Sequence, residues 1–174
     1  MTVLLREIPA SGLRVGFDLS HGWAAESLAG SLVDVSCATL RAEVVLLRSH
    51  HDVIVQGKIF GGFDVPCARC TAAAAFALDL PFALTFVPTG EDRDDDLELS
   101  EEDLDVVPYT DEEIKLSDVF REQILLSLPI AHLCREDCKG LCPVCGKDRN
   151  ESPCGCSSES KGGRFAVLKD LKLD

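Results

Sequence analysis

Six of the nine cysteines in this 174-residue chain lie within 23 positions, between Cys134 and Cys156. Two others form the pair Cys67 and Cys70, and Cys37 stands alone in an apolar stretch, where we expect it in the core. No apolar run approaches the roughly 20 residues that span a bilayer, and the N-terminus lacks the pattern of a secretory signal. We therefore expect a cytoplasmic protein, in which grouped cysteines are metal ligands or redox groups more often than disulfides.

The segment Cys142-Pro-Val-Cys145-Gly146 carries the clearest metal-binding pattern. Two thiolates separated by two residues can hold one ion when the backbone between them turns tightly, and a following glycine accepts the positive φ of such a turn. Zinc takes four such ligands in a tetrahedron and then has no open position for a substrate. We therefore expect one structural zinc ion, with Cys138 and either Cys154 or Cys156 completing the set.

The chain has more thiols than one tetrahedron needs, so two arrangements stay open. Either Cys134 and one downstream thiol are spare, or a second ion binds with help from Cys67 and Cys70. The candidate metal ligands are thus Cys134, Cys138, Cys142, Cys145, Cys154 and Cys156, with Cys67 and Cys70 as further candidates. His132, close to Cys134, is a fallback ligand. Iron–sulfur ligation and a redox role for the Cys67–Cys70 pair are the chemical alternatives.

The first 90 residues have the alternating hydrophobicity of an antiparallel β-sheet. Apolar side chains recur at every second position over 76–86, which predicts a strand with one face on a core. Two further strands are expected over 53–59 and 41–48, joined by a short polar turn. We expect Gly61-Gly62 to interrupt the first of these two, and Cys67–Cys70 to lie in a bulge or tight turn at a strand end.

One strong helix is expected over 116–128, where apolar residues recur at helical spacing. Ser117 can cap its start, and Pro129 ends it. Leu125-Leu126 widen the apolar stripe, which indicates packing on two sides. A short early helix is expected over 23–28.

These elements predict an α+β fold in three parts: a mostly antiparallel β domain over 1–90, an acidic linker over 91–113, and a C-terminal part over 114–174. The last part holds the packed helix, a small Cys-rich zinc-binding lobe and a short amphipathic helix. The linker contains 13 acidic residues and one basic residue, whereas the rest of the chain has 17 acidic and 16 basic residues. Such charge density favours a mobile loop, although Leu97, Leu99, Leu104 and Val106-Val107 leave a partly docked strand or helical turn open.

The sequence offers no candidate catalytic residues. It has no phosphate-binding Gly-rich loop, no nucleophile elbow and no His-Glu-x-x-His zinc motif. The acidic balance also argues against a nucleic-acid contact over the whole surface, which usually needs a basic face. We therefore expect a non-enzymatic protein with no small-molecule substrate and no membrane contact.

Two motifs resemble the YceD family of bacterial and plastid proteins, described as large ribosomal RNA subunit accumulation proteins. One is the stretch 116–156, in which Arg121–Pro129 leads into Cys134-Arg-Glu-Asp-Cys138 and Cys142-Pro-Val-Cys145-Gly, with Asn150 at the family's usual asparagine position. The other is Val65-Pro-Cys67-Ala-Arg-Cys70. The resemblance implies a role in the accumulation or maturation of large-subunit ribosomal RNA. It carries no enzymatic activity over, and because some members lack the C-terminal cysteines, it implies that the metal stabilises a local module.

Three functions follow from these observations. The resemblance favours a factor for ribosome assembly that binds a ribosomal protein, a pre-ribosomal particle or rRNA. Composition and spacing alone favour an acidic adaptor that binds a protein and has no RNA role. A thiol redox or metal-carrier protein would instead use Cys67 and Cys70.

Overall fold

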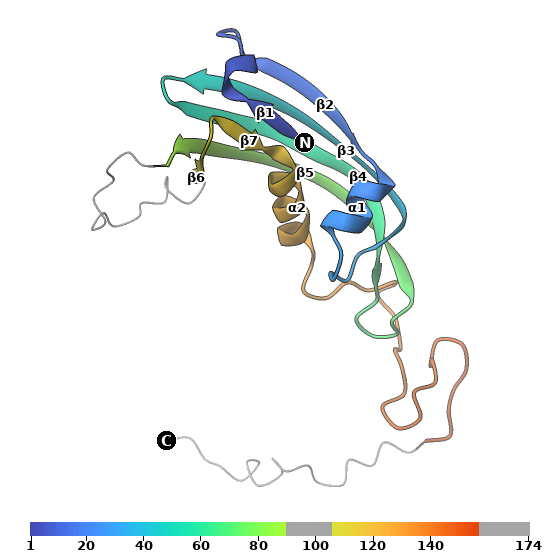
Figure 1. Cartoon of the computed structure of the whole chain (residues 1–174). Coiled ribbons are helices and arrows are strands. Elements are labelled where there is room, and N and C mark those ends of the chain that lie inside the picture. Colours follow the sequence, from blue (N-terminus) through green and yellow to red (C-terminus); the bar gives the residue numbers. More distant parts are fainter. Residues whose placement is uncertain (90–105, 157–174) are drawn as a thin grey trace, which may run out of the picture.

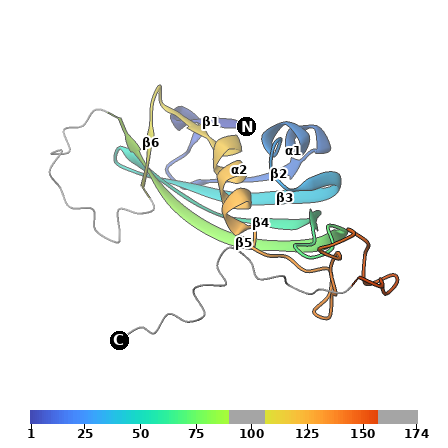
Figure 2. The same cartoon turned by 90° about the horizontal axis from the view of Figure 1, so that it is seen from below.

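The structure is a computed structural model that describes residues 1–89 and 106–156. Within these ranges a curved five-stranded sheet has the order β2-β3-β4-β5-β6, and both α-helices lie on the same side of it (Figure 1, Figure 2). The strands are β2 (Leu13–Leu19), β3 (Asp34–Ser49), β4 (Asp52–Pro66), β5 (Ala73–Pro88) and β6 (Val106–Tyr109). The predicted α+β class is confirmed.

Strands β2 to β5 form an antiparallel meander, as the alternating sequence predicts. The predicted interruption at Gly61-Gly62 is wrong, because β4 stays paired with β5 through Pro66. The irregularity lies in β3 instead, where the register with β4 shifts between Asp34 and Thr39. A Cβ atom on Gly61 would lie 1.8 Å from the carbonyl oxygen of Thr39. Glycine is therefore needed here for close approach of two strands rather than to end one.

Part of the predicted acidic linker belongs to the sheet. Strand β6 pairs parallel to the last residues of β5, from Thr85 to Pro88. The Tyr109 hydroxyl donates to the His51 carbonyl oxygen at 2.7 Å and ties β6 to the β3–β4 turn. Strand β7 (Glu113–Lys115) pairs with β1 (Thr2–Leu4) in a separate two-stranded sheet. Residues 90–105, which hold most of the predicted linker, lie outside the described residues.

Helix α2 (Leu116–Ser127) packs its apolar stripe on the sheet. Phe120 is fully buried, with ring centroids 5.7 Å from Phe17 and 6.3 Å from Phe82. Two details differ from the prediction. Lys115 rather than Ser117 is the N-cap and makes no side-chain cap, and Leu126 is 79% exposed, so α2 is not packed on two sides there.

The remaining helices are short. The 3-10 helix η1 (Leu5–Glu7) follows β1, and helix α1 (His21–Ser27) starts after Ser20, whose hydroxyl accepts from the Trp23 N–H. This places the early helix close to its predicted position at 23–28. Among the described residues no helix has both the length and the apolar composition needed to cross a membrane.

After α2 the chain runs to the cysteine lobe, which we define as residues 134–156. The lobe lies beyond the β4–β5 turn, at the opposite end of β5 from β6 (Figure 1). On the way, His132 stacks edge-on against Phe76, and its Nε2 lies 3.2 Å from the Ala75 carbonyl oxygen. The short C-terminal helix expected from the sequence lies outside the described residues.

Two candidate metal centres

The first cysteine group joins two distant parts of the chain. Cys67 and Cys70 lie in the turn between β4 and β5, and Cys134 and Cys138 begin the cysteine lobe. The Sγ atoms of Cys67 and Cys138 are 3.8 Å apart, and those of Cys70 and Cys134 are 3.7 Å apart. All four sulfurs lie within 4.8 Å of one another. The turn of the β-sheet and the lobe therefore meet at one cluster of thiols.

The second cysteine group is local to the lobe. It consists of Cys142, Cys145, Cys154 and Cys156, whose sulfurs also lie within 4.8 Å of one another. A tetrahedral ion with metal–sulfur bonds of about 2.3 Å requires sulfur–sulfur distances of about 3.8 Å. The two distances measured in the first group match this spacing, so its thiols fit a single ion. Both groups have the donor set of a closed structural zinc site.

The same backbone turn builds both centres. In each, the first cysteine (Cys67 or Cys142) is followed after four residues by a position with positive φ, Thr71 at 62° and Gly146 at 73°. Three hydrogen bonds recur in the two turns with matching lengths. The positive-φ residue donates its N–H to the carbonyl oxygen of the first cysteine at 2.9 Å, and the first cysteine donates its own N–H to the carbonyl oxygen five residues later at 2.8 Å (Ala72 or Lys147). The N–H two residues after the first cysteine (Arg69 or Val144) donates to the sulfur of that cysteine at 3.4 Å. Such amide donors stabilise thiolate charge.

These amide donors also set the acidity of the leading thiols. The backbone N–H of Cys134, followed by those of Arg69 and Cys70, lowers the pKa of Cys67 to about 6. The pKa of Cys142 is lowered to about 6, chiefly by the backbone N–H of Cys145. A thiolate at neutral pH is the form that binds a metal ion.

Other thiols in the same groups are shifted in the opposite direction. Desolvation, and then the neighbouring Cys70 sulfur, raises the pKa of Cys134 to about 12. The Cys145 sulfur raises the pKa of Cys156 to about 12. Like charges within 5 Å disfavour a second thiolate unless a cation is present. A bound cation would therefore favour the thiolate form of these thiols.

The two groups differ in burial and in span. Three of the four thiols in the first group are buried, and only Cys134 is exposed. In the second group Cys142 is buried, whereas Cys145 and Cys156 are exposed. The first group also crosses from the sheet to the lobe, whereas the second closes a loop within the lobe. An ion in the first group would therefore fix the lobe to the sheet.

The lobe docks on the β4–β5 turn through Arg69. The Arg69 guanidinium donates to the Cys138 carbonyl oxygen at 2.9 Å. The Arg69 carbonyl oxygen accepts from the Leu141 N–H at 2.9 Å. Gly140, with φ of 67°, faces this carbonyl, and a Cβ there would lie 2.8 Å from the Arg69 oxygen. The missing side chain of Gly140 thus allows the lobe to approach the turn.

The structure groups the predicted ligands differently from the first arrangement expected. Cys138 was expected to share an ion with Cys142 and Cys145, but it lies with Cys67, Cys70 and Cys134. Cys154 and Cys156 both lie with Cys142 and Cys145, where only one of them was expected. This grouping is the one that the second arrangement requires, in which Cys67 and Cys70 join a second cluster of thiols. The pairing could not be read from spacing alone, because 64 or more residues separate its halves. Gly140, two residues after Cys138, has the positive φ of a tight turn. This glycine could have indicated that Cys138 lies in a turn of its own, separate from the Cys142 turn.

A further prediction, for a single residue, is wrong. Cys37 was expected in the core but is exposed at a strand irregularity, where its thiol donates to Asp64 at 3.3 Å. His132, the fallback ligand, belongs to neither cysteine group and instead contacts β5.

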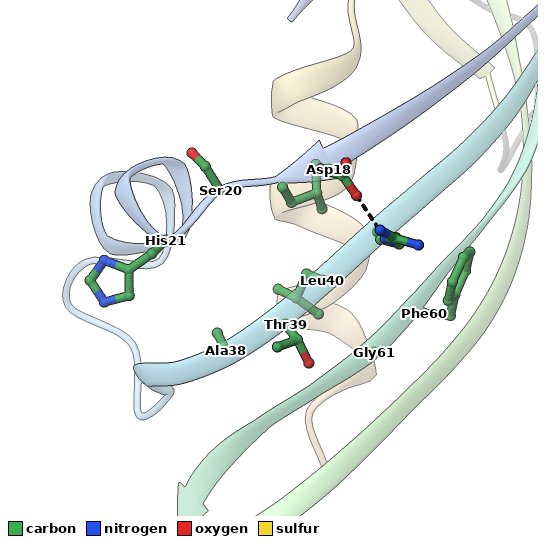
Figure 3. Close-up of a pocket in the computed structure, with 10 residues that line it drawn as sticks. Asp18, Ser20, His21, Ala38, Thr39, Leu40, Phe60 and Gly61 are labelled. Carbon is green, nitrogen blue, oxygen red and sulfur yellow. Dashed lines mark ion pairs between the residues drawn. The ribbon is translucent and has the colours of Figure 1, made fainter.

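The described part of the chain also has a surface cavity of about 530 Å³. It is lined by β2, β3 and β4, beside the ion pair of Asp18 and Arg41, whose Oδ1 and Nε are 2.7 Å apart (Figure 3). Its lining brings His21 and Thr39 to the rim, but no described interaction joins either to a nucleophile or a base. None of its lining residues belongs to a cysteine group.

Comparisons with known proteins point to one family. The family model described as large ribosomal RNA subunit accumulation protein YceD matches residues 55–172. Uncharacterized proteins of Mycobacterium tuberculosis and Mycobacterium bovis are each 33% identical over 142 residues, which cover 82% of this chain and 63% of the relative. The chloroplastic large ribosomal RNA subunit accumulation protein YCED homolog 1 of Arabidopsis thaliana is 34% identical over 60 residues, or 34% of this chain and 19% of its own length. No solved structure matches.

Proposed function

This chain belongs to the YceD family of large ribosomal RNA subunit accumulation proteins, and on that premise we propose that it is a non-enzymatic cytoplasmic factor that supports accumulation of large-subunit ribosomal RNA. In this proposal each cysteine group holds one structural zinc ion. The observation that carries the metal assignment is the pair of equivalent turns, each of which contributes two thiols to a tight group of four. The chain spans 63% of the length of its mycobacterial relatives.

Zinc is the ion that we assign to both groups. Four thiolates around one ion give a closed tetrahedron, and zinc in such sites contributes folding energy directly. An iron–sulfur cluster places iron and inorganic sulfide between its cysteines, which requires wider sulfur spacing than the 3.7 and 3.8 Å of the first group. The ions would hold the lobe in shape and leave partner contacts to its surface.

The partner in this proposal is a ribosomal protein, a pre-ribosomal particle or rRNA. The lobe exposes Arg135, Lys139, Lys147 and Arg149, and metal binding would fix the spacing of these side chains. Asp111 and Glu112 are exposed just after β6, at the other end of β5, where they would favour a basic protein. Strand β5 has 16 residues, which corresponds to about 50 Å along the strand. We therefore assign candidate partner contacts to both ends of the sheet.

A redox function for Cys67 and Cys70 is less well supported. A redox pair starts a helix whose dipole stabilises the thiolate, whereas this pair lies in a strand-to-strand turn. Its sulfurs also approach two further thiols, which is the arrangement of a metal site.

The proposal is tested in cells that lack the protein. Loss should reduce large-subunit rRNA relative to small-subunit rRNA, and the wild-type chain should restore the ratio. A variant with Cys67→Ser and Cys70→Ser should fail to restore it, whereas Cys37→Ser, an exposed thiol outside both groups, should succeed. An unchanged rRNA ratio in the deletion would favour the protein-binding adaptor and contradict the proposed function.

A further inference from the structure

Asn150 lies on the loop of one cysteine group, but its side chain contacts the other group. The residue stands between Cys145 and Cys154, so the loop that carries it is closed by the second group. Its Nδ2 lies 3.4 Å from the Cys138 Sγ of the first group and donates to it. Its Oδ1 accepts from the Lys139 N–H at 2.8 Å. One amide therefore binds both the sulfur of Cys138 and the backbone that follows it.

The loop holds this amide in a fixed orientation. Asp148 Oδ1 accepts from the backbone N–H of Asn150 at 2.8 Å and from its Nδ2 at 2.7 Å. The same stretch is paired with the start of the Cys142 turn, through the bridge between Leu141 and Asp148 and through Cys142 N to Lys147 O at 2.8 Å. The position of Asn150 thus depends on the turn that the second group would clamp.

We propose that Asn150 couples the two metal centres, so that an ion in the second group raises the affinity of the first group for its own ion. The inference rests on the proposed pair of zinc ions. Hydrogen bonds to ligand atoms from outside the coordination shell typically contribute 10- to 100-fold to metal affinity. In this proposal, an empty second group leaves the loop less firmly held and weakens the bond to Cys138. Linkage requires the effect to be reciprocal.

The test is a double-mutant cycle on zinc affinity, measured by competition with a chromophoric chelator. The variants are Asn150→Ala, the pair Cys154→Ser and Cys156→Ser, and all three changes together. Alkylation and mass spectrometry identify which cysteines each ion protects. We expect Asn150→Ala and the double-serine variant each to weaken zinc binding by the first group 10- to 100-fold. The triple variant should lie within about threefold of the double-serine variant, because both changes remove the same bond.

A spectroscopic measurement separates positioning from general loss of structure. With Co²⁺ in the first group, the thiolate-to-metal charge-transfer band should move to lower energy in Asn150→Ala, since the donor to Cys138 is gone. Ser152→Ala serves as the matched control, because Ser152 is exposed on the same loop and only its backbone N–H has a described hydrogen bond. It should leave both affinities and the band unchanged.

Three results would overturn the coupling. The first is an unchanged zinc affinity of the first group in Asn150→Ala. The second is a loss of affinity in the triple variant equal to the product of the losses in the two parent variants. The third is loss of both ions from Asn150→Ala, because the second group of that variant keeps all four sulfurs. A wild-type protein that binds no zinc would instead contradict the proposed metal centres themselves. The two failures are therefore distinguishable.

Discussion

Thr71 and Gly146 occupy the same position in two equivalent turns, each one residue after the second cysteine of a Cys-x-x-Cys pair, and both have positive φ. Glycine adopts this conformation at little cost, whereas a residue with a Cβ is strained there by about 1–2 kcal/mol. The first turn tolerates threonine because β4 and β5 hold it on both sides. The second turn has only the lobe around it, and there the chain has glycine.

Gly146→Ala should weaken zinc binding by the second group about 5- to 30-fold, which corresponds to about 1–2 kcal/mol of backbone strain. No atom lies within 4 Å of the added Cβ, so steric contact contributes nothing. Gly155→Ala is the control, because Gly155 lies in the same lobe without a positive φ and also has open space. Equal affinities for the two variants in chelator competition would contradict the strain argument.

Gly140→Ala should have a larger effect on the first group than Gly146→Ala has on the second. The new Cβ would meet the Arg69 carbonyl oxygen at 2.8 Å in addition to the strain of a positive φ. Both effects together correspond to a loss of at least about 30-fold in zinc affinity. Limited proteolysis should also show earlier cleavage between the sheet and the lobe. Affinity within threefold of wild type would mean that the lobe does not dock on Arg69.

Phe120→Ala should lower the free energy of unfolding of the β-sheet and its packed helices by about 3–5 kcal/mol, because the ring is fully buried between α2 and the sheet. Urea unfolding can be followed by the fluorescence of the single tryptophan, Trp23. Leu126→Ala on the same helix is the control: its side chain is 79% exposed, and its effect should stay within about 0.5 kcal/mol. A small effect of Phe120→Ala would contradict the placement of α2.

The metal-free protein should contain thiols that titrate near pH 6. Hydrogen bonds from backbone N–H groups lower the pKa of Cys67 and Cys142 to about 6 from the ordinary 9.0. A pKa lowered by folding stabilises the folded state above the unfolded pKa, and this contribution is lost as the pH falls from about 9 through about 6. Thiolate absorbance should report this titration, and Cys142→Ser should remove one of its steps. Titration of every thiol above pH 8 would contradict the N–H contacts.

Much of the fold could be predicted because its signals are local. The alternation over 76–86 gave β5, and the apolar stripe over 116–128 gave α2. Parallel β6 could not be predicted as such: the apolar residues Leu97, Leu99, Leu104 and Val106-Val107 are equally compatible with a docked strand and a helical turn, because four residues after a strongly acidic run carry little periodicity. The exposed position of Cys37 depends on the register shift of β3 between the pairs Asp34–Asp64 and Thr39–Gly62, which hydrophobicity does not encode.

The candidate site could be predicted in composition but not in pairing. All eight thiols of the two groups were recognised as candidates from their spacing, and the Cys142 turn was recognised from Gly146. The partner of Cys138 could not be found this way, because Cys67 reaches it only after β4 and β5 have paired. Asn150 was noted only for its resemblance to a family position, and its contact with Cys138 required the loop in three dimensions.

Elemental analysis by mass spectrometry of the natively purified chain is the most direct test of the two proposed zinc centres. We predict two zinc ions per chain, with one remaining after Cys154→Ser and Cys156→Ser are introduced together. Protein that contains no zinc, and whose eight grouped thiols are alkylated freely while the sheet stays folded, would contradict these centres.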